Sequence, residues 1–259
     1  MKKMIALVLA VLMTLTLFAG CGAKEGSDLA AVKKAKKIVV GITDYAPMDY
    51  KDASGEWTGF DAEFARLFAA ELGVEVEFFV LSDWGQKFYE LETKNIDCVW
   101  NGMTITEEAL LNASVSDPYV VNAQVIVMKA DAVANYPDTD SIKGLSFAVE
   151  SDSAGETALV DLGITGFTAL QDQTSALMEV KAGTADACVI DITMANAMTG
   201  EGTNYADLAA GISLTSEEYG VAFRKDSDLT AKFNEFMAKL IADGTLQQLA
   251  DKYQLTLAK

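Results

Sequence analysis

A run of small polar residues follows a short apolar stretch before the middle of the chain. Ile96–Trp100 is predicted to form a strand, and Asn101, Gly102, Met103 and Thr104 come directly after it. These residues include an amide, a bare backbone and a hydroxyl, which are hydrogen-bonding groups suited to a small ligand. Because ligands of open α/β sheets bind beyond the carboxyl ends of strands, we expect this turn to form the floor of a ligand site.

Two groups further along the chain are suited to bind charged parts of a ligand. Asp191 ends an apolar stretch, and a carboxylate there suits a cationic ligand through charge-assisted hydrogen bonds. Asp191 would also serve as the N-cap of a helix over residues 192–199, and both roles are compatible. Residues 151–155 are typical of a helix start, so backbone amides around Ser153 and Gly155 are expected to offer an anion site.

The composition argues against several other kinds of chemistry. The chain of 259 residues contains no histidine, which excludes histidine-based triads and the usual zinc sites, although Glu and Lys can still act as acid and base. We predict no cofactor and no metal. The formal charge is −18; such acidity argues against nucleic acid and against anionic membrane surfaces.

Strands and helices alternate through both halves of the chain, which predicts sheets built from βαβ units. In the first half we expect strands at 38–42, 74–80 and 96–100 and helices at 61–72 and 84–94. The second half repeats this order, with strands at 147–150 and 186–191 and helices ending near Gly163 and Gly183.

Two long extended segments, 119–130 and 213–223, lie between and after these units, and the C-terminus is helical. We therefore predict an α/β clamshell of two lobes, each a mainly parallel sheet flanked by helices. Lobe 1 is expected to comprise 38–121 and 217–259, and lobe 2 to comprise 122–216. Two crossings between lobes suit a hinge.

The N-terminus is typical of an exported protein. Lys2 and Lys3 precede an apolar run, and Ala19-Gly20-Cys21 follows, which predicts a lipoprotein signal peptide over 1–20 with Cys21 as the lipidated residue. An ordinary signal peptide cut nearby is the alternative. Removing 1–20 would take away two lysines and leave −18 − 2 = −20. Residues 21–37 are expected to be a tether, and Cys98 and Cys188 to be buried free thiols.

Several short motifs together resemble family 3 of the extracellular solute-binding proteins, the receptors of polar amino-acid ABC importers. The motifs span roughly residues 38–255 and comprise Tyr45–Met48, Gly59–Asp61, Ile96–Asp97, Met103–Thr106, Ser116–Tyr119, Gly183–Asp186, Asp191 and Asp243–Thr245. The resemblance implies a type II periplasmic-binding-protein fold that closes on a ligand. It also implies a monomer, outside the cytoplasm and anchored to the membrane by lipid, that serves an ABC permease.

The resemblance also assigns roles to single residues. Tyr45 and Trp84 match aromatic residues whose faces stack on the ligand, although a turn residue and a core tryptophan are the alternatives. Asp191 matches the carboxylate that receives the α-ammonium group of the ligand.

One residue departs from the family pattern. Ala109 stands where the family has an arginine that binds the ligand carboxylate, and two acidic residues precede it. A carboxylate would then be held mainly by backbone amides around Ser153–Gly155. Lys87 is a second candidate, which we interpret as a solvated surface lysine. The ligand is expected to be a small amino acid or a related amine; a dehydratase-like enzyme and a ligand sensor are the alternatives.

The N-terminal motif generates a direct prediction. Replacing Cys21 with Ala removes the thiol that would carry the lipid, so the mature protein should leave the membrane fraction or remain unprocessed. Membrane fractionation with immunoblotting measures this outcome. A Cys21→Ala variant that stays membrane-bound and is correctly processed would contradict lipid anchoring.

Overall fold

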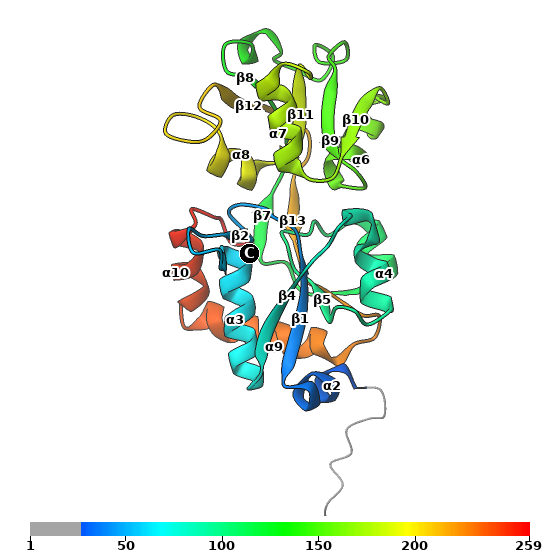
Figure 1. Ribbon diagram of the computed structural model, residues 1–259, viewed down its shortest axis with the longest axis vertical. Helices are drawn as coiled ribbons and strands as arrows, with labels where there is room; N and C mark the ends of the chain where they lie inside the picture. The colour runs from blue at the N-terminus through cyan, green and yellow to red at the C-terminus, as the bar shows by residue number, and fades with distance from the viewer. Residues whose placement is uncertain (1–26) are drawn as a thin grey trace, which may run out of the picture.

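The computed structural model describes residues 27–259; the predicted signal peptide and Cys21 lie outside the described residues. Two five-stranded sheets form separate lobes, which lie one above the other in Figure 1. The predicted α/β class with two lobes is therefore confirmed. Among the described residues, no helix is long and apolar enough to cross a membrane.

The lower lobe in Figure 1 contains the sheet with strand order β4-β1-β5-β14-β6. Strand β1 is parallel to β4 and β5, whereas β14 is antiparallel to β5 and β6. Its strands are β1 (Lys37–Ile42), β4 (Glu75–Val80), β5 (Cys98–Val99), β6 (Ser114–Val115) and β14 (Ala222–Phe223), with the small hairpin β2 (Tyr50–Lys51) and β3 (Trp57–Thr58). Its helices are α2 (Asp28–Ala35), α3 (Phe60–Leu72), η1 (Trp84–Gln86), α4 (Lys87–Glu92), α5 (Glu107–Asn112), α9 (Asp228–Ala242) and α10 (Thr245–Lys252).

The upper lobe contains the sheet with strand order β10-β9-β11-β8-β12. Strand β9 is parallel to β10 and β11, whereas β8 is antiparallel to β11 and β12. Its strands are β8 (Gln124–Lys129), β9 (Phe147–Glu150), β10 (Phe167–Leu170), β11 (Ala187–Asp191) and β12 (Leu208–Ser213). Its helices are η2 (Val133–Asn135), α6 (Ala154–Asp161), α7 (Gln173–Ala182) and α8 (Ile192–Met198).

Four of the five strands in each sheet run in the same direction, as predicted, and one strand, β14 or β8, runs against them. The reason is that β8 and β14 directly follow the two strands that cross between lobes, β7 (Val120–Asn122) and β13 (Glu217–Tyr219). Each therefore enters its sheet from the edge that faces the other lobe and runs against its neighbours. Strands β7 and β13 pair antiparallel, with Tyr219 opposite Val120. The predicted lobe boundaries fall at these two strands, and that division stays a prediction.

Several elements end at the residues that the sequence indicates. Helix α3 ends at Gly73, whose φ of 71° places it in the left-handed region. Helix α6 begins after Ser153, whose hydroxyl accepts a hydrogen bond from the Glu156 amide. The region from Trp84 differs, because a 3₁₀ turn precedes a short α-helix that ends at Glu92.

The predicted tether over 21–37 needs a correction. Residues Asp28–Ala35 form helix α2, because Ser27 caps the helix and Val32 packs in the core. Asp28 also pairs with Arg224, whose Nε lies 3.1 Å from the carboxylate. Helix α2 is therefore part of the first lobe.

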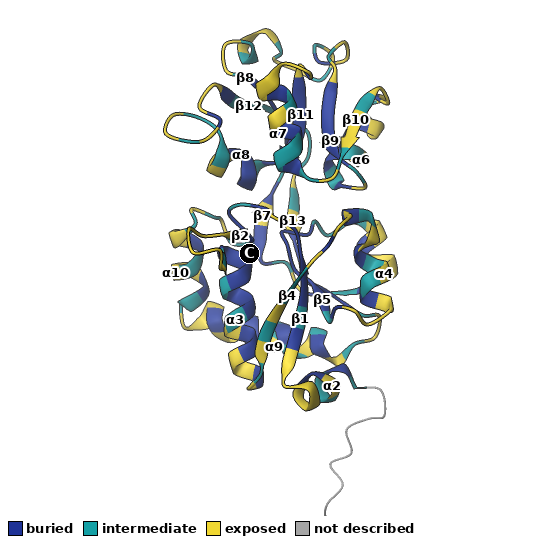
Figure 2. Ribbon diagram, viewed as in Figure 1, coloured by how far each residue is buried: buried dark blue, intermediate teal, exposed yellow. Residues whose placement is uncertain are grey.

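Aromatic side chains of α3 and α9 fill the core of the first lobe. Phe64 packs against Phe233 and Trp100, with ring centroids 5.4 and 4.9 Å away, respectively. Figure 2 shows that α3 and α9 turn their buried faces toward the sheet. Cys98 and Cys188 are buried and free, as predicted, and lie in different sheets.

Two buried carboxylates support the loops at the upper edge of the first sheet. Asp61 Oδ2 accepts hydrogen bonds from the Gly102 amide at 2.6 Å and from the Tyr119 hydroxyl at 2.8 Å. Asp49 Oδ2 accepts a hydrogen bond from the Asn101 side chain at 2.8 Å. The Oδ1 atoms of both residues have no partner among the described residues.

Burial sets the protonation of this pair. It raises the pKa of Asp61 to about 7, although the hydrogen bonds from Gly102 and Tyr119 lower this pKa. Burial and the charge of Asp61 raise the pKa of Asp49 well above its usual value. Between pH 4 and pH 7 the folded chain therefore holds a proton that the unfolded chain has released. The free energy of unfolding consequently falls as the pH rises through this range.

We predict that Asp61→Asn removes part of this pH-dependent decrease in the free energy of unfolding. Asparagine keeps an oxygen that accepts from Gly102 and Tyr119 but carries no charge, so the decline between pH 4.5 and pH 7.5 should shrink by roughly 2 kcal/mol or more. Urea denaturation across this pH range measures the effect. The exposed residue Glu75 provides the control as Glu75→Gln. An unchanged pH slope in Asp61→Asn would contradict the assignment.

Candidate functional site

A cavity of about 480 Å³ lies between the two lobes and takes residues from both. This volume lies within the range of small-molecule sites, roughly 300–1,000 Å³. Eight of the residues predicted to bind ligand line it: Tyr45, Trp84, Asn101, Gly102, Met103, Thr104, Ser153 and Asp191. Gly155 does not line the cavity. A Cβ there would lie 3.0 Å from Gln124 Oε1 and 3.1 Å from a Val189 methyl group, so Gly155 lets α6 pack closely on the sheet.

The floor of the cavity follows the ends of β1 and β5, as expected. The Asn101 side chain is already engaged, since it accepts from the Thr43 hydroxyl at 2.6 Å and donates to Asp49. In this conformation the Asn101 amide holds the floor in place, and its role as a ligand donor stays a prediction. Gly102 has a φ of 53°, and a Cβ there would lie 2.6 Å from the Tyr45 ring. Glycine at this position thus lets the Tyr45 ring lie directly on the floor.

Tyr45 joins both lobes at the back of the cavity. Its hydroxyl lies 2.5 Å from the Thr193 hydroxyl of α8 and 2.5 Å from the Tyr219 hydroxyl of β13. A second contact between lobes runs from the Gln171 side chain to the Ser82 carbonyl, at 3.1 Å. The lobes therefore touch through polar groups in this conformation.

Asp191 lies at the end of β11 and is nearly fully buried. It occupies the first position before α8, yet its side chain makes no capping hydrogen bond. Instead it accepts from the side-chain amides of Asn122, Gln124 and Gln173, with the Gln124 contact at 2.8 Å. The carboxylate is thus held by neutral amides and aimed away from its own helix.

Glu217 of β13 shares two of these amides, those of Asn122 and Gln124. Its Oε1 accepts from Asn122 at 2.6 Å, from Gln124 at 2.7 Å and from the Thr104 hydroxyl at 2.8 Å. The hydroxyl of Thr104, predicted to bind ligand, is therefore also used within the protein. Burial raises the pKa of Asp191 to about 6, and the charge of Glu217 adds to this shift.

Glu150 is an acidic residue of the site that the sequence analysis missed. It ends β9, the strand next to β11, and is nearly fully buried while lining the cavity. Burial raises the pKa of Glu150 to about 8, and the charge of Asp191 adds to this shift. The sequence signal was available, because Glu150 ends a predicted strand as Asp191 does.

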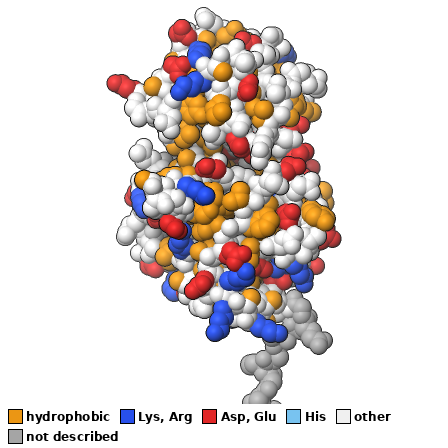
Figure 3. Space-filling model, viewed as in Figure 1, with side chains coloured by type: hydrophobic (Ala, Val, Ile, Leu, Met, Phe, Trp, Pro, Cys, Tyr) orange, Lys and Arg blue, Asp and Glu red, His pale blue; other side chains and the backbone are white. Residues whose placement is uncertain are grey.

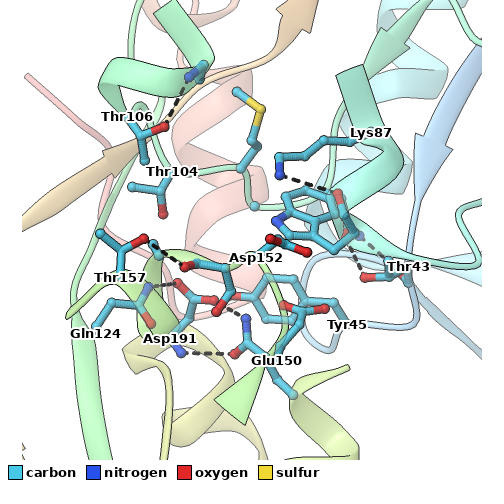
Figure 4. A pocket seen from close by; sticks show the side chains of 18 of the residues that line it. Thr43, Tyr45, Lys87, Thr104, Thr106, Gln124, Glu150, Asp152, Thr157 and Asp191 are labelled. Atoms are coloured by element: carbon cyan, nitrogen blue, oxygen red, sulfur yellow. Dashed lines mark hydrogen bonds between the residues drawn. The ribbon is translucent and has the colours of Figure 1, made fainter. Parts of the chain in front are cut away.

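The cavity as a whole is strongly acidic. Figure 3 shows acidic side chains at the constriction between the lobes, and Figure 4 shows Glu150, Asp152 and Asp191 close together inside it. Seven acidic residues line the cavity: Asp44, Glu107, Glu108, Glu150, Asp152, Asp161 and Asp191. They face a single lysine, Lys87. Such an excess of carboxylates favours a cation by electrostatic attraction.

The interpretation of Lys87 as a solvated surface lysine is wrong. Lys87 is only 5% exposed and lines the cavity from the start of α4, because its helix turns this face toward the upper lobe. Burial lowers its pKa, and the charges of Glu108 and Asp152 partly offset that shift. Ala109 also lines the cavity, so the position where the family has an arginine faces the same cavity as Lys87.

The sequence matches a known family over most of its length. Residues 38–256 match the bacterial extracellular solute-binding proteins, family 3. The arginine-binding extracellular protein ArtP of Bacillus subtilis (strain 168) is 30% identical over 261 residues, which cover 98% of each chain.

Solved structures agree with this match. A mutant of ArgBP from T. maritima superposes with a TM-score of 0.81 at 31% identity, over 87% of this chain and 98% of that one. The ancestral amino acid-binding protein AncCDT-1, a precursor of cyclohexadienyl dehydratase, superposes with a TM-score of 0.80 at 31% identity, over 88% of this chain and 99% of that one. The family resemblance in the motifs is thus confirmed: the chain belongs to the bacterial extracellular solute-binding proteins of family 3.

Proposed function

We propose that this protein captures an amino acid with a positively charged side chain between its lobes and delivers it to an ABC importer. The observation that carries the proposal is the cavity lining, in which seven acidic residues face one lysine. The similarity to ArtP, whose name describes it as arginine-binding, supports the same ligand class.

Asp191 is the proposed partner of the ligand α-ammonium group. Its two oxygens accept three amide hydrogen bonds, and an ionised carboxylate has about four acceptor sites. One site therefore remains for an ammonium group. The rings of Tyr45 and Trp84 are the proposed walls for the aliphatic stem of the ligand, and both line the cavity.

Glu150 is the proposed partner of a second positive charge on the ligand. It lies on the strand beside Asp191, and burial keeps it protonated near neutral pH. A bound cation would favour the ionised form, so ligand binding is expected to expel its proton.

We propose binding without catalysis. A dehydratase-like activity is the second candidate, since a protonated Glu150 is a potential general acid and one structural neighbour is a precursor of a dehydratase. That neighbour is itself described as an amino acid-binding protein, which favours a receptor. Recovery of unaltered ligand after long incubation, followed by NMR, would separate the two.

The cellular setting completes the proposal. The family is extracellular by description, and Cys21 would anchor the mature chain at the outer face of the cytoplasmic membrane. We propose a monomer that docks on a permease. Signalling without transport is the alternative, which uptake of labelled ligand by cells lacking the protein would test.

A calorimetric panel of amino acids tests the central assignment. We expect tight binding of arginine, lysine, ornithine or histidine and weak binding of acidic and apolar amino acids. Asp191→Asn should weaken the preferred ligand about tenfold or more, because one charged hydrogen-bond partner is lost. Asp131→Asn, an exposed change in the same lobe, is the matched control. Equal affinity of Asp191→Asn and wild type would overturn the assignment.

The Glu150 proton generates a pH prediction. Burial raises the pKa of Glu150 most; the charges of Asp191 and Asp172 add to the shift, whereas the Gln173 hydrogen bond and the charge of Lys87 oppose it. Because a cation binds the ionised form, the affinity for L-arginine should rise severalfold between pH 6 and pH 8. Proton release should be visible as a buffer-dependent binding enthalpy. Glu150→Gln should remove most of both effects and leave the smaller part that comes from Asp191, whose pKa is about 6. An unchanged pH profile in that variant would contradict the role of Glu150.

A further inference from the structure

Lys87 is a buried cation with few partners inside the protein. Its Nζ donates to the Trp84 carbonyl at 3.3 Å and lies 4.8 Å from the centroid of the Trp84 ring and 5.0 Å from that of Phe88. Among residues 27–259, no carboxylate forms an ion pair with it. An ammonium group has three donors, and burying it unpaired is costly. The group therefore lacks an anionic partner.

The position of Lys87 suggests where that partner comes from. Lys87 and Ala109 line the same cavity from the first lobe, whereas Asp191 and Glu150 line it from the second. A zwitterion placed between them would meet Lys87 on the side of the first lobe, which Asp44, Glu107 and Glu108 also line, and only acidic charged groups on the side of the second lobe. Lys87 is thus the one cationic side chain in this lining that could bind a ligand carboxylate.

The N-terminus of α6, the anion site expected from the sequence, is engaged in part by side chains of the protein itself. The Ser153 hydroxyl accepts from the Glu156 amide at 3.1 Å, and Glu156 Oε2 accepts from the Asp152 amide at 2.7 Å. Two acidic side chains, Asp152 and Glu156, therefore stand at this helix end. Their charges disfavour a second carboxylate there.

We propose that Lys87 binds the ligand carboxylate and replaces the arginine that is absent at position 109. The ligand is then an α-amino acid with a cationic side chain, and its decarboxylated amine is rejected. This inference rests on the proposed function and deepens it, since it adds the chemical group that the first lobe recognises. The ammonium group lies over the Trp84 and Phe88 rings, and Lys87 lines the cavity.

A different role for Lys87 makes a distinguishable prediction. Glu150 and Asp152 of the second lobe act on Lys87 electrostatically, so the lysine would also serve as a latch between closing lobes. A latch contributes to the binding of every ligand that closes the lobes. A carboxylate-binding residue contributes only where the ligand has a carboxylate.

The test compares L-arginine with agmatine, which is arginine without its carboxylate. Calorimetry on the full mature chain would use wild type, Lys87→Met, Lys87→Arg and the exposed control Lys34→Met. Methionine keeps an unbranched apolar stem against Trp84 and Phe88, and thermal unfolding checks that each variant is folded. We expect wild type and Lys34→Met to prefer L-arginine by about tenfold or more, the scale of one charged hydrogen bond.

In Lys87→Met the preference should fall to within about threefold, through weaker binding of L-arginine while agmatine binds as well as before or better. Lys87→Arg should retain the preference, because it keeps the charge. An undiminished preference in Lys87→Met, equal losses for both ligands, or equal losses in Lys87→Arg and Lys87→Met would each overturn the inference. If wild type binds neither ligand, the proposed function fails, and this inference fails with it.

Discussion

Two carboxylates that share two amides form the centre of this molecule. Asn122 and Gln124 each donate hydrogen bonds to both Asp191 and Glu217, at the point where β7 and β13 cross between the lobes. Neutral amides hold the two acids in place but leave their negative charge uncompensated. A cation in the adjacent cavity would supply the missing charge. The acidity of the site and the crossing of the chain between the lobes are therefore aspects of one arrangement.

This arrangement also connects the ligand site to both lobes. Glu217 belongs to a crossing strand and accepts from Thr104 on the floor of the first lobe. Tyr45 reaches Thr193 in the second lobe and Tyr219 on the same crossing strand. A ligand bound at Asp191 would thus contact a network whose groups belong to both lobes and to a crossing strand.

The fold was largely predictable, because its signals are local. Apolar runs and glycine stops placed β1 and α3, and the repeated order of elements indicated two lobes. Most of the predicted site residues line the cavity, since residues after parallel strands meet at one edge. Glu150 was missed, and Lys87 was interpreted as a solvated surface lysine, for a non-local reason. Whether a helix residue is buried, or one strand lies beside another, depends on lobe packing and on strand order, which no short motif encodes. The direction of the Asn101 amide depends likewise on Asp49, which lies far away in the sequence.

The most direct test of the account isolates a single charge on the ligand. L-Citrulline has nearly the same size and shape as L-arginine, but its ureido group is neutral where arginine carries a guanidinium group. Calorimetric titration of both at pH 7.5 compares ligands that differ little except in that charge. The acidic cavity predicts that L-arginine binds about tenfold or more tightly than L-citrulline. Equal affinities, or tighter binding of L-citrulline, would contradict the claim that the carboxylates of this cavity select a cationic amino acid.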